Sequence, residues 1–255
     1  MSRMAITRGI SAIMDRCELV HLERVPLDIE LLRKQHRAYE KLLIKLGCTL
    51  IELPSEDRLP DSVFVEDTAV IFDGFAVITR PGAASRRPET PTIAAVLEPY
   101  MELHEVVAPG TLDGGDVLCV DKTVFVGNSS RSNETAVHQL ESILSARGYD
   151  LRTVGVEHCL HLKSAATWIG KQRLLVNPEW VDISHFSGYE LVEVAPSEPS
   201  AANTLVLGDI VVHARAFPLT RARMEVLGVH VAPVDISEIS KAEGAVTCCS
   251  LVFDA

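Results

Sequence analysis

No apolar run in the sequence reaches the roughly 18 residues that a membrane-spanning helix needs. The first 25 residues also lack an apolar stretch followed by small residues, so no secretory signal is expected there. We therefore expect a cytoplasmic protein whose six cysteines stay reduced. None of these cysteines has CxxC spacing, which argues against a structural zinc site.

The sequence also has fewer basic than acidic residues and no nucleotide-binding motif. The 24 Lys and Arg residues are outnumbered by 35 Asp and Glu residues, and the formal net charge is −11. Nucleic acid is therefore not an expected partner, because its binding requires a concentrated basic face. The sequence has no GxGxxG, Walker A or HExxH motif, so neither a nucleotide cofactor nor a metal is expected.

What the sequence does contain is a repeated hairpin pattern. Each copy has two apolar runs around a short polar turn, as expected for two antiparallel strands. The predicted turns are Asp73–Gly74, Asp121–Lys122, Gly170–Lys171 and Gly208–Asp209. Two further runs, Met4–Ile10 and Cys249–Ala255, each read as a strand without a neighbouring partner in the sequence. The simplest account pairs them with each other.

Amphipathic segments fill the gaps between the hairpins. Apolar residues at helical spacing predict helices over residues 28–47, 132–148 with Ser132 as N-cap, and 219–228, while residues 91–104 are a weaker candidate. Repeated strand and helix units whose ends meet favour one closed domain, residues 1–255, of five pseudo-symmetric ββαβ-type units. An irregular α/β sandwich built from the same elements is the alternative.

Each hairpin follows a polar stretch of the sequence. The residues concerned are Asp61, Glu66 and Asp67; Asp113 and Asp116; His161 and Lys163; Asn203; and the TCCS sequence with Cys248 and Cys249. If rotation relates the units, these stretches lie together near a common axis. A thiol, an imidazole and carboxylates would then face one cavity, as in nucleophilic cysteine catalysis.

Each of these residues also has an ordinary structural interpretation. Free cysteine is often buried as a small apolar group, and His161 between two leucines could be a core histidine. Asp113 before two glycines could serve only a turn. In a strand, the two adjacent cysteines would point to opposite faces, so we do not expect them to chelate a metal together.

The charges together describe a substrate. Buried acids such as Glu66 and Asp67 need a cation, whereas arginines bind anions such as a carboxylate. Arg86 and Arg87 lie in one predicted loop and Arg131 lies at the start of a predicted helix; all could equally be solvated. An amino acid with a cationic side chain satisfies both sets of charges.

Six motifs in order make the sequence similar to the dimethylarginine dimethylaminohydrolase family, within the guanidino-group-modifying superfamily that includes arginine deiminase. They are LPDSVFVED, ITRPGAASRR, LDGGDVL, LHLKS, AAN and TCCS. The resemblance covers nearly the whole chain and implies a five-bladed α/β propeller, the pentein fold. It also implies hydrolysis of methylated arginines to citrulline through a covalent cysteine intermediate, by an enzyme without a cofactor acting as a monomer or homodimer.

The resemblance assigns roles to individual residues. Catalysis falls to Cys248 as nucleophile, His161 as general acid and base, and Asp113 as the carboxylate that orients the histidine. Substrate binding falls to Asp61, Glu66 and Asp67 around the guanidinium, to Arg86 and Arg131 at the α-carboxylate, and to the Ala242 carbonyl at the α-ammonium group.

Two features depart from the family pattern. Some members carry Glu where this chain has Asp113, and residues 11–23, the lid segment, match poorly. The family's lid leucine has Cys17 or Glu18 as its nearest counterpart here. The alternatives are an arginine deiminase or an amidinotransferase, both from longer relatives, and a propeller that binds arginine derivatives without catalysis.

Overall fold

Strands of the computed structural model, which describes residues 2–255, form five separate three-stranded sheets. In each sheet the middle strand pairs antiparallel with one neighbour and parallel with the other. The sheets are β15 (Leu251–Asp254), β1 (Arg3–Arg8) and β2 (Cys48–Leu53); β3 (Ala69–Ile71), β4 (Phe75–Ile78) and β5 (Glu102–Glu105); β6 (Val117–Val120), β7 (Thr123–Asn128) and β8 (Asp150–Gly155); β9 (Ala166–Trp168), β10 (Arg173–Val176) and β11 (Glu190–Glu193); and β12 (Thr204–Leu207), β13 (Ile210–Ala214) and β14 (His230–Val234).

Helical segments join the middle strand of each sheet to its parallel neighbour, because a parallel pair needs a crossover connection. Four sheets use a regular helix and one uses a 3-10 turn: α1 (Ile29–Lys45), α2 (Thr90–Leu97), α3 (Glu134–Ser145), η5 (Ile183–Phe186) and α5 (Pro218–Val226). The remaining short turns are η1 (Met14–Arg16), η2 (Val65–Thr68), η3 (Ala84–Glu89), η4 (Gly114–Asp116), α4 (Leu162–Ala165) and α6 (Ser237–Ser240).

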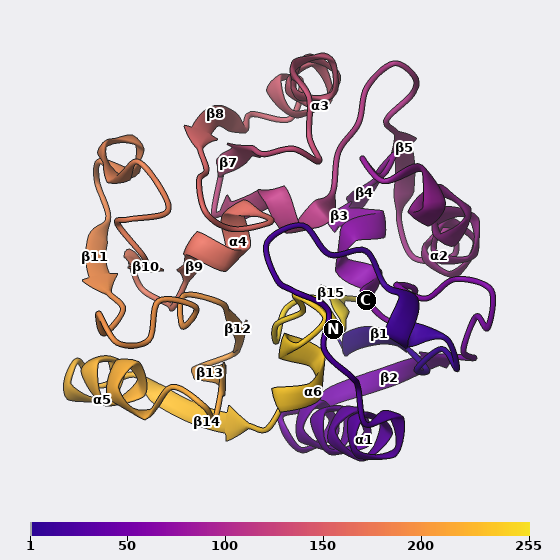
Figure 1. The fold of residues 1–255 in the computed structure, drawn as a ribbon. Coiled ribbons are helices and arrows are strands. Elements are labelled where there is room, and N and C mark those ends of the chain that lie inside the picture. The colour runs from indigo at the N-terminus through magenta and orange to yellow at the C-terminus, as the bar shows by residue number, and fades with distance from the viewer. Residues whose placement is uncertain (1) are drawn as a thin grey trace.

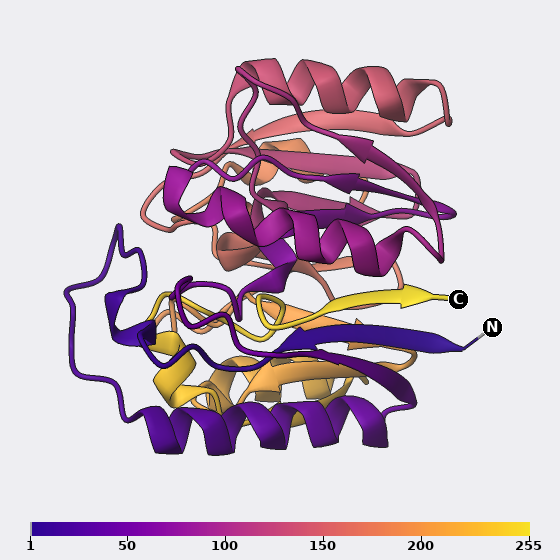
Figure 2. The same cartoon turned by 90° about the vertical axis from the view of Figure 1, so that its right-hand side faces the viewer.

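The five sheets follow one another around a common centre, with the longer helices on the outside (Figure 1). The first and last strands meet in one sheet, where β1 pairs antiparallel with β15 from Arg3–Asp254 to Ile6–Leu251. The predicted pairing of the two terminal strands is therefore confirmed. Figure 2 shows the loop that follows β1 standing off at one end of the strands, opposite the two chain termini.

The four predicted hairpins are all present, with the turns where the sequence placed them. Gly74 has a φ of +79°, a left-handed conformation that suits glycine in such a turn. Helix α1 begins at the N-cap Asp28, whose side chain accepts the Leu31 N–H. It is followed by Gly47 at φ +94°, as the predicted glycine stop requires.

Three local predictions are wrong. The segment 91–104 is not one helix, since α2 ends at Leu97 and β5 follows. Asn133 rather than Ser132 caps α3, because the Asn133 side chain accepts the Ala136 N–H while the Ser132 hydroxyl binds a buried carboxylate. The last strand begins only at Leu251, so the two cysteines lie in the preceding turn.

Apolar side chains fill the space between each sheet and its helix. On α3, for example, Leu140 and Leu144 are fully buried in the same cluster as Val124 and Val126 of β7. Burying such side chains contributes about 1.5–3 kcal/mol each. Among residues 2–255, none of the helices combines the length and apolar character required to cross a membrane.

Candidate active site

Short turns lead into the first strand of several sheets and carry the polar residues singled out in the sequence. Turn η2 precedes β3, η4 precedes β6, α4 precedes β9, and residues 246–249 form a turn before β15. Hydrogen bonds connect these turns to one another at the centre of the molecule. The prediction that the polar stretches gather in one place is confirmed by these contacts.

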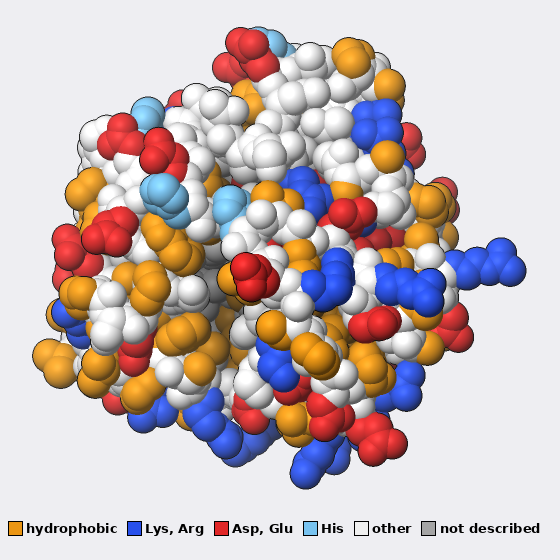
Figure 3. All heavy atoms as spheres, in the orientation of Figure 1, with side chains coloured by type: hydrophobic (Ala, Val, Ile, Leu, Met, Phe, Trp, Pro, Cys, Tyr) orange, Lys and Arg blue, Asp and Glu red, His pale blue; other side chains and the backbone are white. Residues whose placement is uncertain are grey.

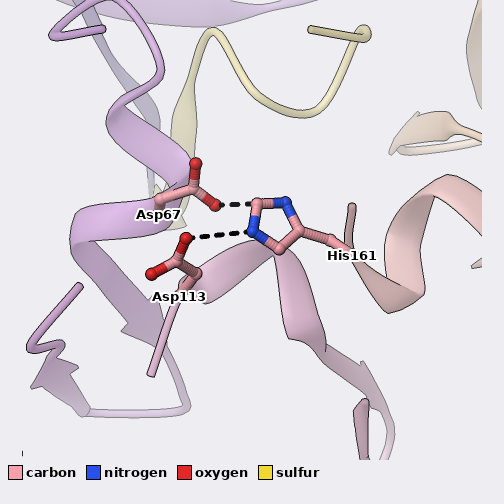
Figure 4. Close-up of side chains that lie close together, drawn as sticks. All are labelled: Asp67, Asp113 and His161. Atoms are coloured by element: carbon pink, nitrogen blue, oxygen red, sulfur yellow. Dashed lines mark hydrogen bonds and ion pairs between the residues drawn. The ribbon is translucent and has the colours of Figure 1, made fainter. Parts of the chain in front are cut away.

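Two carboxylates from different units, Asp67 and Asp113, lie next to each other beside the ring of His161 (Figure 4). Its Nε2 atom is 3.0 Å from Asp113 Oδ2, and its Nδ1 atom is 3.8 Å from Asp67 Oδ1. Burial alone would lower the pKa of the imidazole, but the charge of Asp67 and the hydrogen bond with Asp113 outweigh it and raise the pKa to about 9. The ring is therefore an imidazolium at neutral pH, ready to donate a proton.

Asp67 is balanced by a second cation, Arg86. The Arg86 Nη1 atom is 2.5 Å from Asp67 Oδ2, and its Nη2 atom is 2.8 Å from Glu89 Oε2. Burial opposes ionisation of Asp67, but His161 and Arg86 together lower the pKa of its carboxyl to about 2. The carboxylates that Arg86 contacts in this structure belong to the protein, so its role at a substrate carboxylate stays a prediction.

The close approach of Asp67 and His161 requires the two glycines of the LDGGD motif. A Cβ at Gly115 would lie 2.6 Å from His161 Nδ1 and 2.8 Å from Asp67 Oδ1, and a Cβ at Gly114 would collide with the Glu66 carbonyl. The Gly115 N–H also donates to Asp67 Oδ1 at 2.9 Å. The glycines thus serve close packing of the site beyond their role in a turn.

Asp67, Asp113 and His161 are also the residues whose ligand atoms, within the described chain, lie within 4.8 Å of one another and could hold a metal ion. In the structure, the two carboxylates pair with the imidazolium of His161 itself, which lies 3.0 Å from Asp113 and 3.8 Å from Asp67. Asp113 uses its second oxygen to accept the Gly82 N–H at 2.8 Å. The donor set is thus already used by internal ion pairs and hydrogen bonds.

Glu66 makes a separate set of contacts. Its Oε1 atom accepts a hydrogen bond from Lys163 Nζ at 2.6 Å, and its Oε2 atom accepts one from the Thr247 hydroxyl at 2.6 Å. The Glu66 N–H donates to the Cys248 carbonyl at 3.2 Å. Both oxygens are occupied by the protein, and the predicted contact of Glu66 with a guanidinium stays a prediction.

Both cysteines of the turn at residues 246–249 contact one apolar cluster: Cys249 is buried in it, and Cys248 is partly buried against it. The Ala245 N–H donates to Cys248 Sγ at 3.3 Å. Tyr39 of α1 holds the turn from below through a 2.7 Å hydrogen bond to the Val246 carbonyl. Burial of the sulfur, followed by the charges of Glu66 and Asp67, holds the pKa of the Cys248 thiol well above its usual range.

The lid segment covers this centre through main-chain hydrogen bonds. The Glu18 N–H donates to both carboxylate oxygens of Asp61, at 3.1 and 3.2 Å. The N–H groups of Val20, His21 and Leu22 all donate to Glu243 Oε1, at 3.0, 2.6 and 2.6 Å. The lid is thus held by two carboxylates, one of which, Asp61, was singled out in the sequence.

Arg131 and Ala242 complete the predicted set. Arg131 is buried, and its guanidinium has no hydrogen-bond or ion-pair partner within residues 2–255. It lies near enough to Asp61 to lower the pKa of that carboxyl, although burial of Asp61 leaves its pKa raised. The Ala242 carbonyl likewise accepts no hydrogen bond from the described chain. Their predicted contacts with the substrate's α-carboxylate and α-ammonium groups stay predictions.

Figure 3 shows this face of the molecule as spheres, with charged and apolar side chains mixed around a hollow left of centre. A cavity of about 250 Å³ lies next to the lid segment, between Leu22 on one side and Trp180 and Phe217 on the other. Glu243 and Ala245 also line it, so it adjoins the cysteine turn.

Some polar residues of the site were not assigned a role from the sequence. They are Lys163, Asn203 and Thr247 around Glu66, Asp116, which accepts the Leu162 N–H at 3.1 Å, and Glu243 under the lid. Lys163, Asn203 and Asp116 stood in the polar stretches and could have been found there. Glu243 carried no such signal, because its partners are main-chain groups.

The sequence was compared with known protein families and with individual proteins, and it matches one family over most of its length. The model of the eukaryotic N,N dimethylarginine dimethylhydrolase family matches residues 27–252. The N(G),N(G)-dimethylarginine dimethylaminohydrolase of Streptomyces coelicolor is 37% identical over 98% of this chain and 96% of its own. The enzyme of that name from Pseudomonas aeruginosa is 35% identical over 86% of this chain and 87% of its own. The chain belongs to the dimethylarginine dimethylaminohydrolase family.

Solved structures of this family have the same fold. A cysteine-to-serine variant of the Pseudomonas aeruginosa enzyme, complexed with citrulline, has a TM-score of 0.94 at 32% identity, with 99% of this chain and 100% of that chain covered. The N-terminal domain of a cyanobacterial arginine dihydrolase has a TM-score of 0.88 at 16% identity over 99% of this chain and 97% of that chain, which shows a shared fold alone. As a dimethylarginine dimethylaminohydrolase family member, the chain is a hydrolase that acts on C–N bonds of amidines.

Proposed function

We propose that this enzyme hydrolyses Nω,Nω-dimethyl-L-arginine and Nω-methyl-L-arginine to L-citrulline, with release of dimethylamine or methylamine. The observation that carries the proposal is the His161 imidazolium paired with Asp67 and Asp113, close to the turn of Cys248, whose carbonyl accepts the N–H of Glu66. The names of the relatives and the citrulline complex of the Pseudomonas aeruginosa enzyme support it.

Substrate binding uses charges of both signs. Asp67 and Asp113 hold the guanidinium flat beside the thiol of Cys248. The substrate's α-carboxylate binds Arg131, whose guanidinium is otherwise unpartnered, next to Arg86.

The other end of the amino acid carries an ammonium group. It binds the carbonyl of Ala242, which accepts no hydrogen bond within the described chain. Ala242 directly precedes Glu243, which accepts the N–H groups of the lid segment, so lid closure and recognition of the α-ammonium group are linked.

The first chemical step needs a thiolate that the free enzyme disfavours. Glu66 and Asp67 oppose ionisation of Cys248, and a bound guanidinium offsets that effect by placing a positive charge beside the sulfur. The thiolate attacks the guanidinium carbon and forms a C–S bond. The C–N bond to dimethylamine then breaks, and the departing nitrogen takes a proton from His161, leaving a covalent S-alkylthiouronium.

The second step reuses the same histidine. Neutral His161 takes a proton from water, the hydroxide adds to the thiouronium carbon, and the C–S bond breaks to give citrulline and restore the thiol. Asp113 keeps the imidazole oriented throughout, through the 3.0 Å contact with Nε2. Placing a general acid and base in this way contributes about 10²–10⁴-fold to the rate.

We also infer that the five units form the closed, pseudo-symmetric propeller expected from the sequence, as one domain over residues 1–255. The support is the succession of five similar sheets around one centre and the pairing of β1 with β15. In this arrangement the polar turns meet at the axis, so the site is built from all parts of the chain.

The test is a direct measurement of citrulline from Nω,Nω-dimethylarginine, Nω-methylarginine and arginine, with the released amine measured in parallel. We expect equal amounts of citrulline and methylated amine from the first two compounds and little citrulline from arginine. Citrulline mainly from arginine would identify a deiminase instead. No product from any of the three, with intact protein, would overturn the proposed function.

A further inference from the structure

We propose that Glu66 and Lys163 form a charge-balancing unit that positions the Cys248 turn and sets the reactivity of its thiol, rather than a binding site for the substrate guanidinium. The proposal rests on the proposed function in one respect only, that Cys248 is the nucleophile. It assigns positioning roles to Lys163, Thr247 and Asn203, which touch neither the thiol nor the predicted guanidinium ligands Asp67 and Asp113.

A closed ring of hydrogen bonds carries this assignment. Lys163 Nζ and the Thr247 hydroxyl each donate to one oxygen of Glu66, both at 2.6 Å. Asn203 closes the ring, since its Nδ2 atom donates to Thr247 Oγ1 and to the Lys163 carbonyl, both at 3.0 Å. The Asn203 Oδ1 atom accepts the Thr247 N–H at 3.0 Å.

The ring joins the two catalytic segments. Lys163 lies two residues after His161, and Thr247 directly precedes Cys248. The Glu66 N–H fixes the Cys248 carbonyl at 3.2 Å, so one residue grips the cysteine turn through both its main chain and its side chain. Because Glu66, Asn203 and Thr247 are buried, a lost partner leaves a polar group unsatisfied, and the turn would shift.

Each acid that faces the thiol has its own cation. Glu66 and Asp67, which oppose ionisation of Cys248, lie in turn η2. The other titratable neighbours of the thiol are Cys249, in the turn of residues 246–249, and Tyr39 on α1. Lys163 pairs with Glu66, whereas Arg86 and His161 pair with Asp67. The charge of Lys163 therefore offsets the acid whose effect on the thiol is the larger of the two.

This arrangement separates two roles for an acid in the pocket. If an acid binds the substrate guanidinium, its removal weakens substrate binding and makes the thiol of the free enzyme easier to ionise. A balanced pair gives effects of opposite sign for its two members: loss of Lys163 exposes the thiol to an uncompensated carboxylate, and loss of Glu66 exposes it to an uncompensated ammonium group.

The experiment measures alkylation of Cys248 in the free enzyme, without substrate. Iodoacetamide forms a C–S bond with the thiolate as iodide leaves, and mass spectrometry of the peptide containing Cys248 gives the rate at pH 7–9. At a pH below the pKa of the thiol, the rate of alkylation follows the thiolate fraction. This fraction changes tenfold for each unit by which a substitution shifts the thiol's pKa. The variants are Lys163→Met, Glu66→Gln, the double variant and Lys163→Arg.

A matched control removes an ion pair of similar length away from the site. Arg173 Nε lies 2.7 Å from Glu190 Oε2 between β10 and β11, so Arg173→Met tests the loss of a cation as such. Circular dichroism and the melting temperature identify variants that do not fold. Should Lys163→Met fail to fold, Lys163→Gln removes the same charge and takes its place, and Glu66→Asp, which keeps the charge, is then the control for Glu66→Gln.

We expect Lys163→Met to slow alkylation about tenfold and Glu66→Gln to accelerate it, with the double variant close to the unaltered enzyme. Lys163→Arg and Arg173→Met should leave the rate within about twofold. Equal slowing in both single variants, or no change in either, would overturn the proposal. Because no substrate is present, a chain that acts on a different guanidino compound would still give the expected pattern.

Discussion

The lid segment and the buried centre enclose the same site, yet the chain holds them in different ways. In the centre, side chains contact side chains, as with Asp113 and His161 or Glu66 and Lys163. In the lid, main-chain N–H groups contact two carboxylates, and the side chains of Val20 and Leu22 are 49% exposed. The centre depends on the identity of its residues, whereas residues 18–22 of the lid segment depend mainly on their backbone; at the start of the segment, Met14 and Cys17 are buried in the apolar core.

This difference accounts for a sequence expectation, namely that the lid resembles the family less than the motifs of the centre do. Any residue except proline supplies the N–H groups that Asp61 and Glu243 accept. For residues 18–22 of the lid, the residue identities that matter for these main-chain contacts therefore lie outside the lid, at positions 61 and 243. A poorly matching lid is compatible with an intact lid contact.

The largest expected effect comes from the centre. Cys248→Ser should lower citrulline formation by at least about 10³-fold, because the hydroxyl replaces the nucleophilic thiol while the fold is kept. The neighbouring Cys249→Ser is the control, since Cys249 is buried in the apolar cluster and should alter stability more than turnover. Both are checked by citrulline assay and melting temperature. Retained turnover in Cys248→Ser would remove this residue from the mechanism.

A second test in the centre concerns the proton on His161. The imidazole pKa of about 9 lies above its ordinary value because of the neighbouring carboxylates, so kcat/KM should fall as the pH rises through about 9. Asp113→Asn removes one carboxylate and the anionic acceptor of Nε2. We expect about 10²-fold lower kcat/KM and an alkaline limb displaced to lower pH.

The conservative replacement Asp113→Glu is the control for this test. It keeps the negative charge at this position, where some family members carry Glu. The alkaline limb of the pH profile should therefore stay near its original pH. A limb that does not move in Asp113→Asn would show that a group other than His161 controls it. The profiles are measured as kcat/KM between pH 6 and 10.

The same contrast decides what the sequence could predict. The repeat of apolar runs and turns predicted the hairpins, and side-chain chemistry singled out Asp113, His161 and the pair Cys248 and Cys249, from which the family resemblance selected Cys248. Ser132 and Asn133 are both good N-caps, and only the buried carboxylate of Asp116, which accepts the Ser132 hydroxyl, decides between them. Such long-range competition for a hydroxyl has no local signal.

The lid anchor lay beyond sequence reasoning for a related reason. Glu243 follows a buried alanine in an irregular segment and adopts a φ of +58°, and nothing nearby in the sequence marks it as an acceptor. Its partners are more than 200 residues away and contribute only main-chain N–H groups. Neither apolar periodicity nor motif spacing reports a contact of this kind.

An intermediate effect on substrate affinity is expected from Glu243, which holds the lid segment from outside it. Glu243→Ala removes the acceptor of three N–H groups, and each hydrogen bond to a charged group is worth about 1.5–3 kcal/mol. We expect KM to rise about tenfold with a smaller change in kcat, because the lid grips the bound substrate and takes no part in the chemistry. Limited trypsin cleavage at Arg16 or Arg24 should also become faster.

Glu243→Gln is the matched variant for this prediction. Its amide oxygen can still accept hydrogen bonds at the position of Oε1, although without the charge, so KM should lie between the two extremes. An unaltered KM and unaltered proteolysis in Glu243→Ala would mean that packing, and not this carboxylate, holds the lid.

The smallest effect is expected from the lid's own side chains. Val20→Ala trims a side chain that is half exposed, and such substitutions change stability by about 0.5 kcal/mol or less. KM should therefore stay within about twofold, while the Val20 N–H continues to donate to Glu243. A tenfold rise in KM for Val20→Ala would reverse the comparison, because lid closure would then depend on side-chain identity. The poor match of the lid sequence would in that case mark a change in how the enzyme grips its substrate.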